Sequence, residues 1–119
     1  MSRLSASQTD IDFQNSILEE VSRTFALTIP KLPPSLVTPV ANAYLLCRIA
    51  DTIEDDPDLT FVEKKQYSNW FAKIMRDKSP AQIFSEELLA KLGPETSPSE
   101  RLLIKEAATV LRVTHSLSN

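Results

Sequence analysis

The stretch that decides the fold is residues 43–56, which read AYLLCRIADTIEDD. Apolar residues recur through this stretch at helical spacing, and Asp-Pro-Asp at residues 56–58 follows it. Because proline disfavours helix in the residue before it, we expect the helix to end there. Its start is predicted near Ser35, with Pro39 in or near the first turn, where the missing amide hydrogen of proline is tolerated.

The last turn of this predicted helix is acidic. Asp51 and Asp55 are four residues apart and share one face, and Glu54 lies on a neighbouring line, so we expect three carboxylates to converge. They repel one another, and the partial negative charge at a helix C-terminus adds to the repulsion. Solvent exposure relieves it, and so does a divalent cation such as Mg²⁺, which prefers oxygen ligands. A polar helix end that runs into a proline loop is the plainer interpretation.

Two more side chains lie on the same stripe of this helix. Arg48 comes three residues before Asp51, and Tyr44 comes four residues before Arg48. Apolar residues flank Arg48, so its guanidinium needs a carboxylate or phosphate partner. The plainer role for Tyr44 is a core aromatic. Cys47 is predicted to be a small buried hydrophobe.

Apolar spacing and capping residues on either side predict further helices. Together they give an all-α chain of about five helices joined by short loops. The expected boundaries are Thr9 as the first N-cap, a further helical turn at 25–29, a capping box at Thr60 and Glu63, a helix from Ser79-Pro80 to Leu92-Gly93-Pro94, and a last helix from about Ser99 to Val113, opened by Ser97 and Glu100.

Composition agrees with an all-α chain and excludes several classes of protein. The 119 residues include one glycine and eight prolines, whereas sheet proteins usually need several glycines for turns. One cysteine and one histidine exclude a disulfide framework and a Cys/His zinc site built from this chain alone. The net charge of −3 argues against nucleic acid as a partner. No signal peptide is evident, and the longest apolar stretch, residues 40–50, is too short to span a bilayer. Residues 1–8 are predicted to be a flexible N-terminus and residues 9–119 a single helical unit.

Two motifs together resemble a known family. Residues 21–26, VSRTFA, are similar to one N-terminal signature of the squalene/phytoene synthases, and residues 43–56 resemble the first aspartate-rich helix of that family. The resemblance implies a partial isoprenoid synthase (terpenoid synthase-like) helical bundle. The family's second aspartate-rich helix has no counterpart after Asp58, so residues 9–119 would be the N-terminal portion of such a domain.

The resemblance also implies an activity, closest to that of squalene synthase. Two farnesyl diphosphates would be joined head to head through presqualene diphosphate and reduced with NADPH to squalene, with Mg²⁺ assisting the departure of diphosphate. The residues implied by position are Asp51, Glu54 and Asp55 as metal ligands, Ser22, Arg23, Phe25 and Arg48 as substrate-binding residues, and Arg48 and Tyr44 as catalytic residues. The ring faces of Phe25 and Tyr44 could stabilise a carbocation.

Alternatives remain open at this point. The chain could belong to a phytoene or other head-to-head synthase, or it could be a non-catalytic helical interaction module. On its own it is expected to be inactive. The single cysteine predicts a reduced, cytoplasmic setting. The resemblance implies peripheral contact of the full-length enzyme with the inner face of a membrane, because squalene is very apolar. The plainer roles for the remaining residues are an ion pair of Arg23 with Glu19 or Glu20, a polar helix end for Ser22, core positions for Phe25, Trp70, Phe71, Ile74 and Met75, a solvated face for Glu63, Lys64 and Lys65, and no role for His115.

Overall fold

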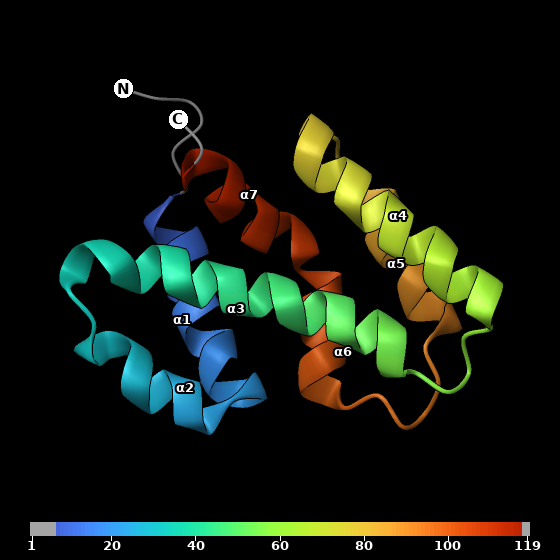
Figure 1. Ribbon diagram of the computed structural model, residues 1–119, viewed down its shortest axis with the longest axis horizontal. Coiled ribbons are helices and arrows are strands. Elements are labelled where there is room, and N and C mark those ends of the chain that lie inside the picture. The colour runs from blue at the N-terminus through green and yellow to red at the C-terminus, as the bar shows by residue number, and fades with distance from the viewer. Residues whose placement is uncertain (1–6, 118–119) are drawn as a thin grey trace.

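The computed structural model describes residues 7–117, and within that range it contains helices and no strands (Figure 1). The all-α prediction is confirmed. The number of helices exceeds five because Ser22 and Glu106 each divide a helical region in two. The elements are α1 (Gln8–Val21), α2 (Arg23–Thr28), the 3-10 helix η1 (Ile29–Lys31), α3 (Pro34–Asp55), α4 (Phe61–Asp77), α5 (Gln82–Lys91), α6 (Pro98–Lys105) and α7 (Ala107–Leu117).

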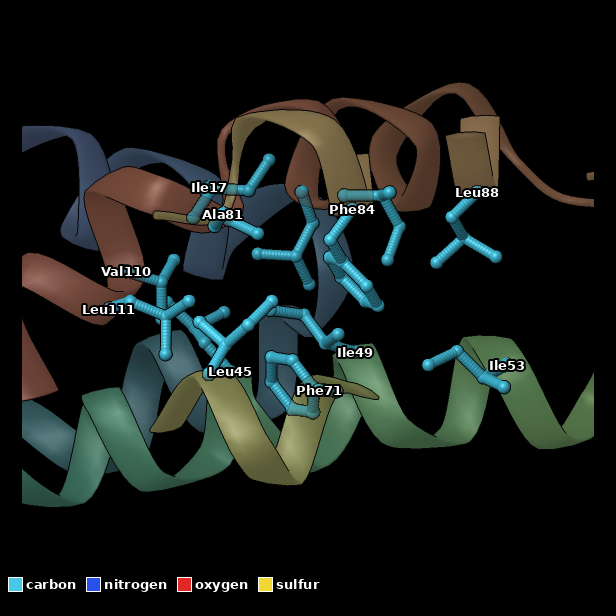
Figure 2. Packing of buried hydrophobic residues seen from close by; sticks show 14 of the residues in the cluster. Ile17, Leu45, Ile49, Ile53, Phe71, Ala81, Phe84, Leu88, Val110 and Leu111 are labelled. Atoms are coloured by element: carbon cyan, nitrogen blue, oxygen red, sulfur yellow. The ribbon is translucent and has the colours of Figure 1, made fainter. Parts of the chain in front are cut away.

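Helix α3 is the central element. It crosses the middle of the molecule in Figure 1 and packs against α1, η1, α4, α6 and α7. Leu45, Ile49 and Ile53 recur every four residues along its inner face and are fully buried. Figure 2 shows these three side chains pointing into the interior, where Phe84 and Leu88 of α5 approach from the other side. The predicted central helix therefore buries its apolar side in the core, and other positions along it, such as Cys47 and Asp51, remain exposed.

A buried polar network joins α3 to the first and last helices. The side-chain amide of Asn42 donates to Oε1 of Gln14 and to the carbonyl oxygen of Val110, both at 2.9 Å. The hydroxyl of Thr114 donates to Oδ1 of Asn42 at 2.8 Å. Since Gln14 and Asn42 are almost fully buried, these bonds replace the water that the amides lose on folding.

Two of the predicted capping boxes are confirmed. At the start of α4, Thr60 Oγ1 accepts from the amide of Glu63 at 3.0 Å, and Glu63 Oε1 accepts from the amide of Thr60 at 2.9 Å. Ser97 and Glu100 make the same reciprocal pair at the start of α6. Each box supplies acceptors to amide groups that have no partner inside the helix.

The predicted start of the first helix is wrong by two residues. Ser7, and not Thr9, is the N-cap of α1, because its hydroxyl accepts from the amide of Asp10 at 3.1 Å. Asp10 returns the bond to the amide of Ser7 at 3.3 Å, which completes a capping box. Gln8 is thus already helical, contrary to the predicted flexible segment; residues 1–6 of that segment lie outside the described residues.

Two other helix ends also differ from expectation. Ala81, with no side-chain cap, stands at the start of α5 where Ser79-Pro80 was expected. Helix α7 continues to Leu117, beyond the predicted end at Val113, because Val110 and Val113 bury one side of it against the core.

Gly93 ends α5 for a reason the sequence does not reveal. The predicted ending of this helix is confirmed in position, but Gly93 has no positive φ. A Cβ atom on Gly93 would instead lie 2.4 Å from Oδ2 of Asp58. Glycine is needed here because two loops, one after α3 and one after α5, approach each other closely.

The predicted core residues of α4 are confirmed in part. Phe71 and Ile74 are buried, whereas Trp70 and Met75 are partly buried at its edge. The prediction for Cys47 is wrong: this residue is exposed on the outer side of α3. None of the described helices is both long enough and apolar enough to cross a lipid bilayer.

Candidate functional site

The C-terminal end of α3 carries the three carboxylates that the motif predicted as metal ligands. Asp51, Glu54 and Asp55 are all exposed. Across residues 7–117, no three His, Cys, Asp or Glu side chains are arranged to hold a metal ion. The expected convergence into one cluster is therefore not present, because repulsion between exposed carboxylates favours separate, hydrated side chains. Their role as ligands stays a prediction.

A lysine from α4 offsets part of the negative charge at this helix end. Nζ of Lys64 donates to the backbone carbonyl oxygen of Glu54, in the last turn of α3. A cation in this position satisfies an unpaired carbonyl and opposes the helix dipole. Lys64 was expected on a solvated face of its helix, and its contact with Glu54 is indeed an exposed one.

Asp56, the residue directly after α3, is a structural carboxylate. Only 2% of it is exposed. Its Oδ2 accepts from the amide of Gly93 at 2.9 Å and from the hydroxyl of Thr96, and its Oδ1 accepts from the amide of Asp58 at 2.8 Å. These bonds fix the end of α3 to the loop between α5 and α6, and so fix the turn that carries Asp51 and Asp55.

The electrostatics of Asp56 follow from the same contacts. Burial acts to raise the pKa of this carboxyl, but the hydrogen bonds from Thr96, Gly93 and Asp58, together with the nearby charge of Arg101, outweigh burial and lower the pKa below its usual value of 3.8. Asp56 is therefore ionised at neutral pH and its oxygens are already occupied. The exposed carboxylates of Asp51, Glu54 and Asp55 have no such set of hydrogen bonds among the described residues.

Arg48 has the carboxylate partner that its apolar flanks require. One Nη2 hydrogen is donated to Oε2 of Glu100 on α6, and both side chains are about one-quarter exposed. The Nε atom of Arg48 is buried without a hydrogen-bond partner. Thr52, one turn further along α3, bonds to the carbonyl oxygen of Arg48 at 2.8 Å. The guanidinium is thus held at one side of α3, facing α6.

Phe25 and Tyr44 come together on the side of α3 that faces α2. Their ring centroids are 4.5 Å apart, with a 37° angle between the planes. Phe25 is 44% exposed and Tyr44 is half-buried. The expectation that Phe25 belongs to the core is wrong, because nearly half of this residue is exposed.

Ser22 and Arg23 form the junction between α1 and α2. The amide of Ser22 donates to the carbonyl oxygen of Leu18 at the end of α1, and its hydroxyl accepts from the amide of Phe25 at 3.3 Å. Ser22 therefore caps α2 as well as ending α1. Arg23 is exposed, and no carboxylate among residues 7–117 pairs with it, so the expected ion pair with Glu19 or Glu20 is absent from the described residues.

An apolar groove runs between the outer side of α3 and α4. It has a volume of about 480 Å³, and Ile53 of its lining lies in the same helical turn as Asp51 and Glu54. The side chains that line it are Ala43, Leu46, Cys47, Ala50, Ile53, Ser68, Phe71, Ala72 and Met75. Helix α3 thus combines the apolar groove that it forms with α4 and an acidic C-terminal end.

Sequence reasoning missed two residues that organise this region. Glu100 was assigned only to a capping box, and Asp56 only to a helix end. The one available signal for Glu100 was the need of Arg48 for an anionic partner, but a partner 52 residues away cannot be chosen from sequence. For Asp56, the signal was a fourth acid in a turn that already carried three.

Comparison with known proteins identifies the relatives of this chain. The sequence profile described as squalene/phytoene synthase matches residues 18–117, which include both motifs and all the candidate site residues. The chain belongs to the squalene/phytoene synthase family. That family has an all-α, terpenoid synthase-like fold, in agreement with the helices of Figure 1.

Individual relatives of this squalene/phytoene synthase family member are squalene synthases. Squalene synthase BSS of Botryococcus braunii is 30% identical over 115 residues, which cover 92% of this chain and 25% of BSS. A probable squalene synthase of Neurospora crassa is 40% identical over 58 residues, or 49% of this chain and 12% of that protein. Squalene synthase of Nicotiana benthamiana is 47% identical over 47 residues, or 40% of this chain and 11% of that protein.

The chain thus spans about a quarter, or less, of the length of these relatives. No solved structure gives a significant match. Family membership suggests an enzyme of the prenyltransferase type.

Proposed function

We propose that this chain forms part of a squalene synthase-like enzyme that joins two farnesyl diphosphates head to head, through presqualene diphosphate, to squalene. The observation that carries the proposal is the exposed acidic end of α3 within a family match that covers residues 18–117. The named relatives are squalene synthases, which favours squalene over phytoene as the product.

The donor set at the end of α3 suits Mg²⁺. Asp51, Glu54 and Asp55 offer hard carboxylate oxygens that are exposed and that no group within residues 7–117 binds, whereas the carboxylate of Asp56 is already hydrogen-bonded within the fold. Mg²⁺ is usually held by one or two carboxylates together with water and substrate phosphates, so a complete cage of protein ligands is not required. When bound, Mg²⁺ would supply charge stabilisation to a departing diphosphate.

The chain's own residues would bind and orient the substrate. Arg48 and Arg23 would attract diphosphate oxygens, since an arginine presents several N–H donors in a fixed plane. The paired rings of Phe25 and Tyr44 would face the allylic part of the substrate and favour positive charge there. Ser22 would hold the backbone that presents Arg23 and Phe25.

The rest of the proposed reaction lies largely outside this chain. Reduction of the intermediate would use NADPH, and no residue of this chain is assigned to bind NADPH. The proposed setting is the cytoplasm, with peripheral contact at the inner face of a membrane, because squalene is very apolar. We expect the chain alone to release no diphosphate from farnesyl diphosphate and Mg²⁺, since a clamp on diphosphate needs groups on more than one side; robust turnover by the isolated chain would contradict this.

The decisive test replaces the aligned segment of Botryococcus BSS by residues 18–117 of this chain and measures squalene formation. We expect the chimera to make squalene, and Asp51→Asn to reduce kcat by about 100-fold or more, because a lost cation contact is worth several kcal/mol.

Asp77→Asn is the matched control for this test. It makes the same chemical change on an exposed residue in the last turn of α4, at the far end of that helix from Lys64 and the acidic end of α3. Its rate should stay within about twofold of the unmodified chimera. If Asp51→Asn behaves like Asp77→Asn, the acidic end of α3 has no part in the reaction.

A further inference from the structure

Arg48 lies three residues before Asp51 on the same helix, a spacing at which opposite charges readily pair. No such pair exists among the described residues. Arg48 is instead bound to Glu100, which reaches it from α6. The choice matters, because an ion pair within α3 would neutralise both the arginine and an aspartate at the acidic end.

Glu100 is itself held in place by the start of α6. Its Oε1 accepts from the amide and the hydroxyl of Ser97, at 3.4 and 3.3 Å, and its Oε2 accepts from Arg48. One oxygen serves the helix cap and the other serves the arginine. The capping box therefore fixes the position of the carboxylate that fixes Arg48.

We propose that Glu100 is a positioning residue, which holds the Arg48 guanidinium against α6 and so prevents an ion pair between Arg48 and Asp51. Arg48 then keeps N–H donors for a diphosphate, and Asp51 stays free for a divalent cation. This inference rests on the proposed function for the identity of the anion, but the contact that it assigns to Glu100 can be tested without any ligand.

The structure offers a close control in Glu63 of α4. Its Oε1 accepts from the amide of Thr60 in a capping box, and its Oε2 pairs with Lys91 at 3.2 Å. Glu63 and Glu100 thus divide their oxygens in the same way, between a helix cap and a cation. Glutamine can replace glutamate in a capping box, so Glu100→Gln and Glu63→Gln both keep the cap and lose the charge.

The first measurement follows the side-chain N–H of Arg48 in the 119-residue chain by NMR, with its signal assigned from its loss in Arg48→Lys. Nε is buried, so its hydrogen should exchange slowly with water in the wild type and in Glu63→Gln. In Glu100→Gln the freed guanidinium should swing outward, and exchange should become about tenfold faster or more. Equal exchange in all three proteins would overturn the proposal.

The second measurement titrates the same three proteins with inorganic diphosphate in the presence of MgCl₂. Glu100→Gln should bind about tenfold more weakly than Glu63→Gln. Equal binding by the two variants, despite a change in Arg48 exchange, would overturn the positioning role.

Two further outcomes separate the possible failures. If Glu100→Gln lowers the Tm by about 5 °C more than Glu63→Gln does, Glu100 serves the fold instead, and the proposal is overturned. If even the wild-type chain fails to bind magnesium diphosphate, the same variants are compared in the BSS chimera, where equal KM values for Glu100→Gln and Glu63→Gln would overturn the positioning role. The Arg48 signal in the chain alone still decides whether Glu100 positions the arginine.

Discussion

Asp56 shows how one acid in an acidic run can differ in role from its neighbours. Asp51, Glu54 and Asp55 face solvent, whereas Asp56 lies buried under two backbone amides and one hydroxyl. Charge and spacing alone do not separate the four acids. The separation comes mainly from the loop after α5, which supplies two of the three donors, from Gly93 and Thr96, 37 and 40 residues away along the chain.

Asp56→Asn should destabilise the chain by about 2 kcal/mol or more at pH 7, because it places an amide NH₂ group where the fold supplies hydrogen-bond donors. Urea unfolding would measure the loss. The exposed Asp77→Asn should change the free energy of unfolding by less than about 0.5 kcal/mol. Similar stabilities for the two variants would mean that the buried contacts of Asp56 do not stabilise the fold.

The pH dependence of this effect has a definite sign. The pKa of Asp56 is lowered in the folded state, so its stabilising effect is complete above the unfolded value, near 3.8, and is lost as the pH falls through the lower folded value. The difference in stability between wild type and Asp56→Asn should therefore be constant above about pH 5 and shrink below it. A difference that stays constant down to acid unfolding would contradict the lowered pKa.

Elements whose signals are local were predicted well. The capping boxes of α4 and α6 depend on residues three apart, and both were recognised in the sequence. The ends of α3 were also placed to within one residue, since its apolar spacing and Pro57 are local features, but Pro39 lies inside the helix and not in its first turn. The exposure of Cys47 and Phe25 could not be predicted, because it depends on which helices cover α3.

Contacts between loops that are far apart in the sequence have no local sequence pattern that predicts them, and Gly93 is the clearest case. Its place at the end of α5 was predicted, but its close approach to Asp58 was not. The pairing of Arg48 with Glu100 was missed for the same reason: it joins two helices far apart in the chain. The candidate site was thus predictable as a set of residue types on α3, whereas the residues that hold it in place were not.

Gly93→Ala should destabilise the chain by about 1–3 kcal/mol, because the new methyl group would overlap the side chain of Asp58. In an Asp58→Gly background the overlapping atoms are gone, so the same substitution should cost much less. A double-mutant cycle measured by urea unfolding gives the coupling between the two positions. Additive effects would show that the two loops do not meet in this way.

At the scale of the whole molecule, a salt bridge joins the first and last described helices. Nε and Nη2 of Arg112 on α7 donate to the two carboxylate oxygens of Asp10 on α1, at 3.0 and 2.9 Å. The hydrogen bond from Arg112 is the largest influence on the pKa of Asp10, and it outweighs burial to lower that pKa. The pair closes the bundle across 102 residues of sequence.

Arg112→Ala should lower the free energy of unfolding at pH 7 by about 1–2 kcal/mol, because it leaves the buried Asp10 carboxylate without its main partner. The effect is modest because 58% of the Arg112 side chain is exposed. Arg76→Ala removes an exposed contact with the adjacent Asp77, and should cost less than about 0.5 kcal/mol. Equal losses in thermal or urea unfolding would mean that the α1–α7 pair acts as an ordinary surface contact.

The central amide network has a consequence for how the chain is made. Asn42 and Gln14 emerge early from a ribosome, but the groups that complete the bonds of Asn42, on Val110 and Thr114, emerge 68 and 72 residues after it. A nascent chain that stops short of α7 would have to keep these amides hydrated, and so could not close its interior. The early helices should therefore stay loosely associated until nearly all of residues 7–117 have left the exit tunnel. During this delay their apolar surfaces would be open to chaperones.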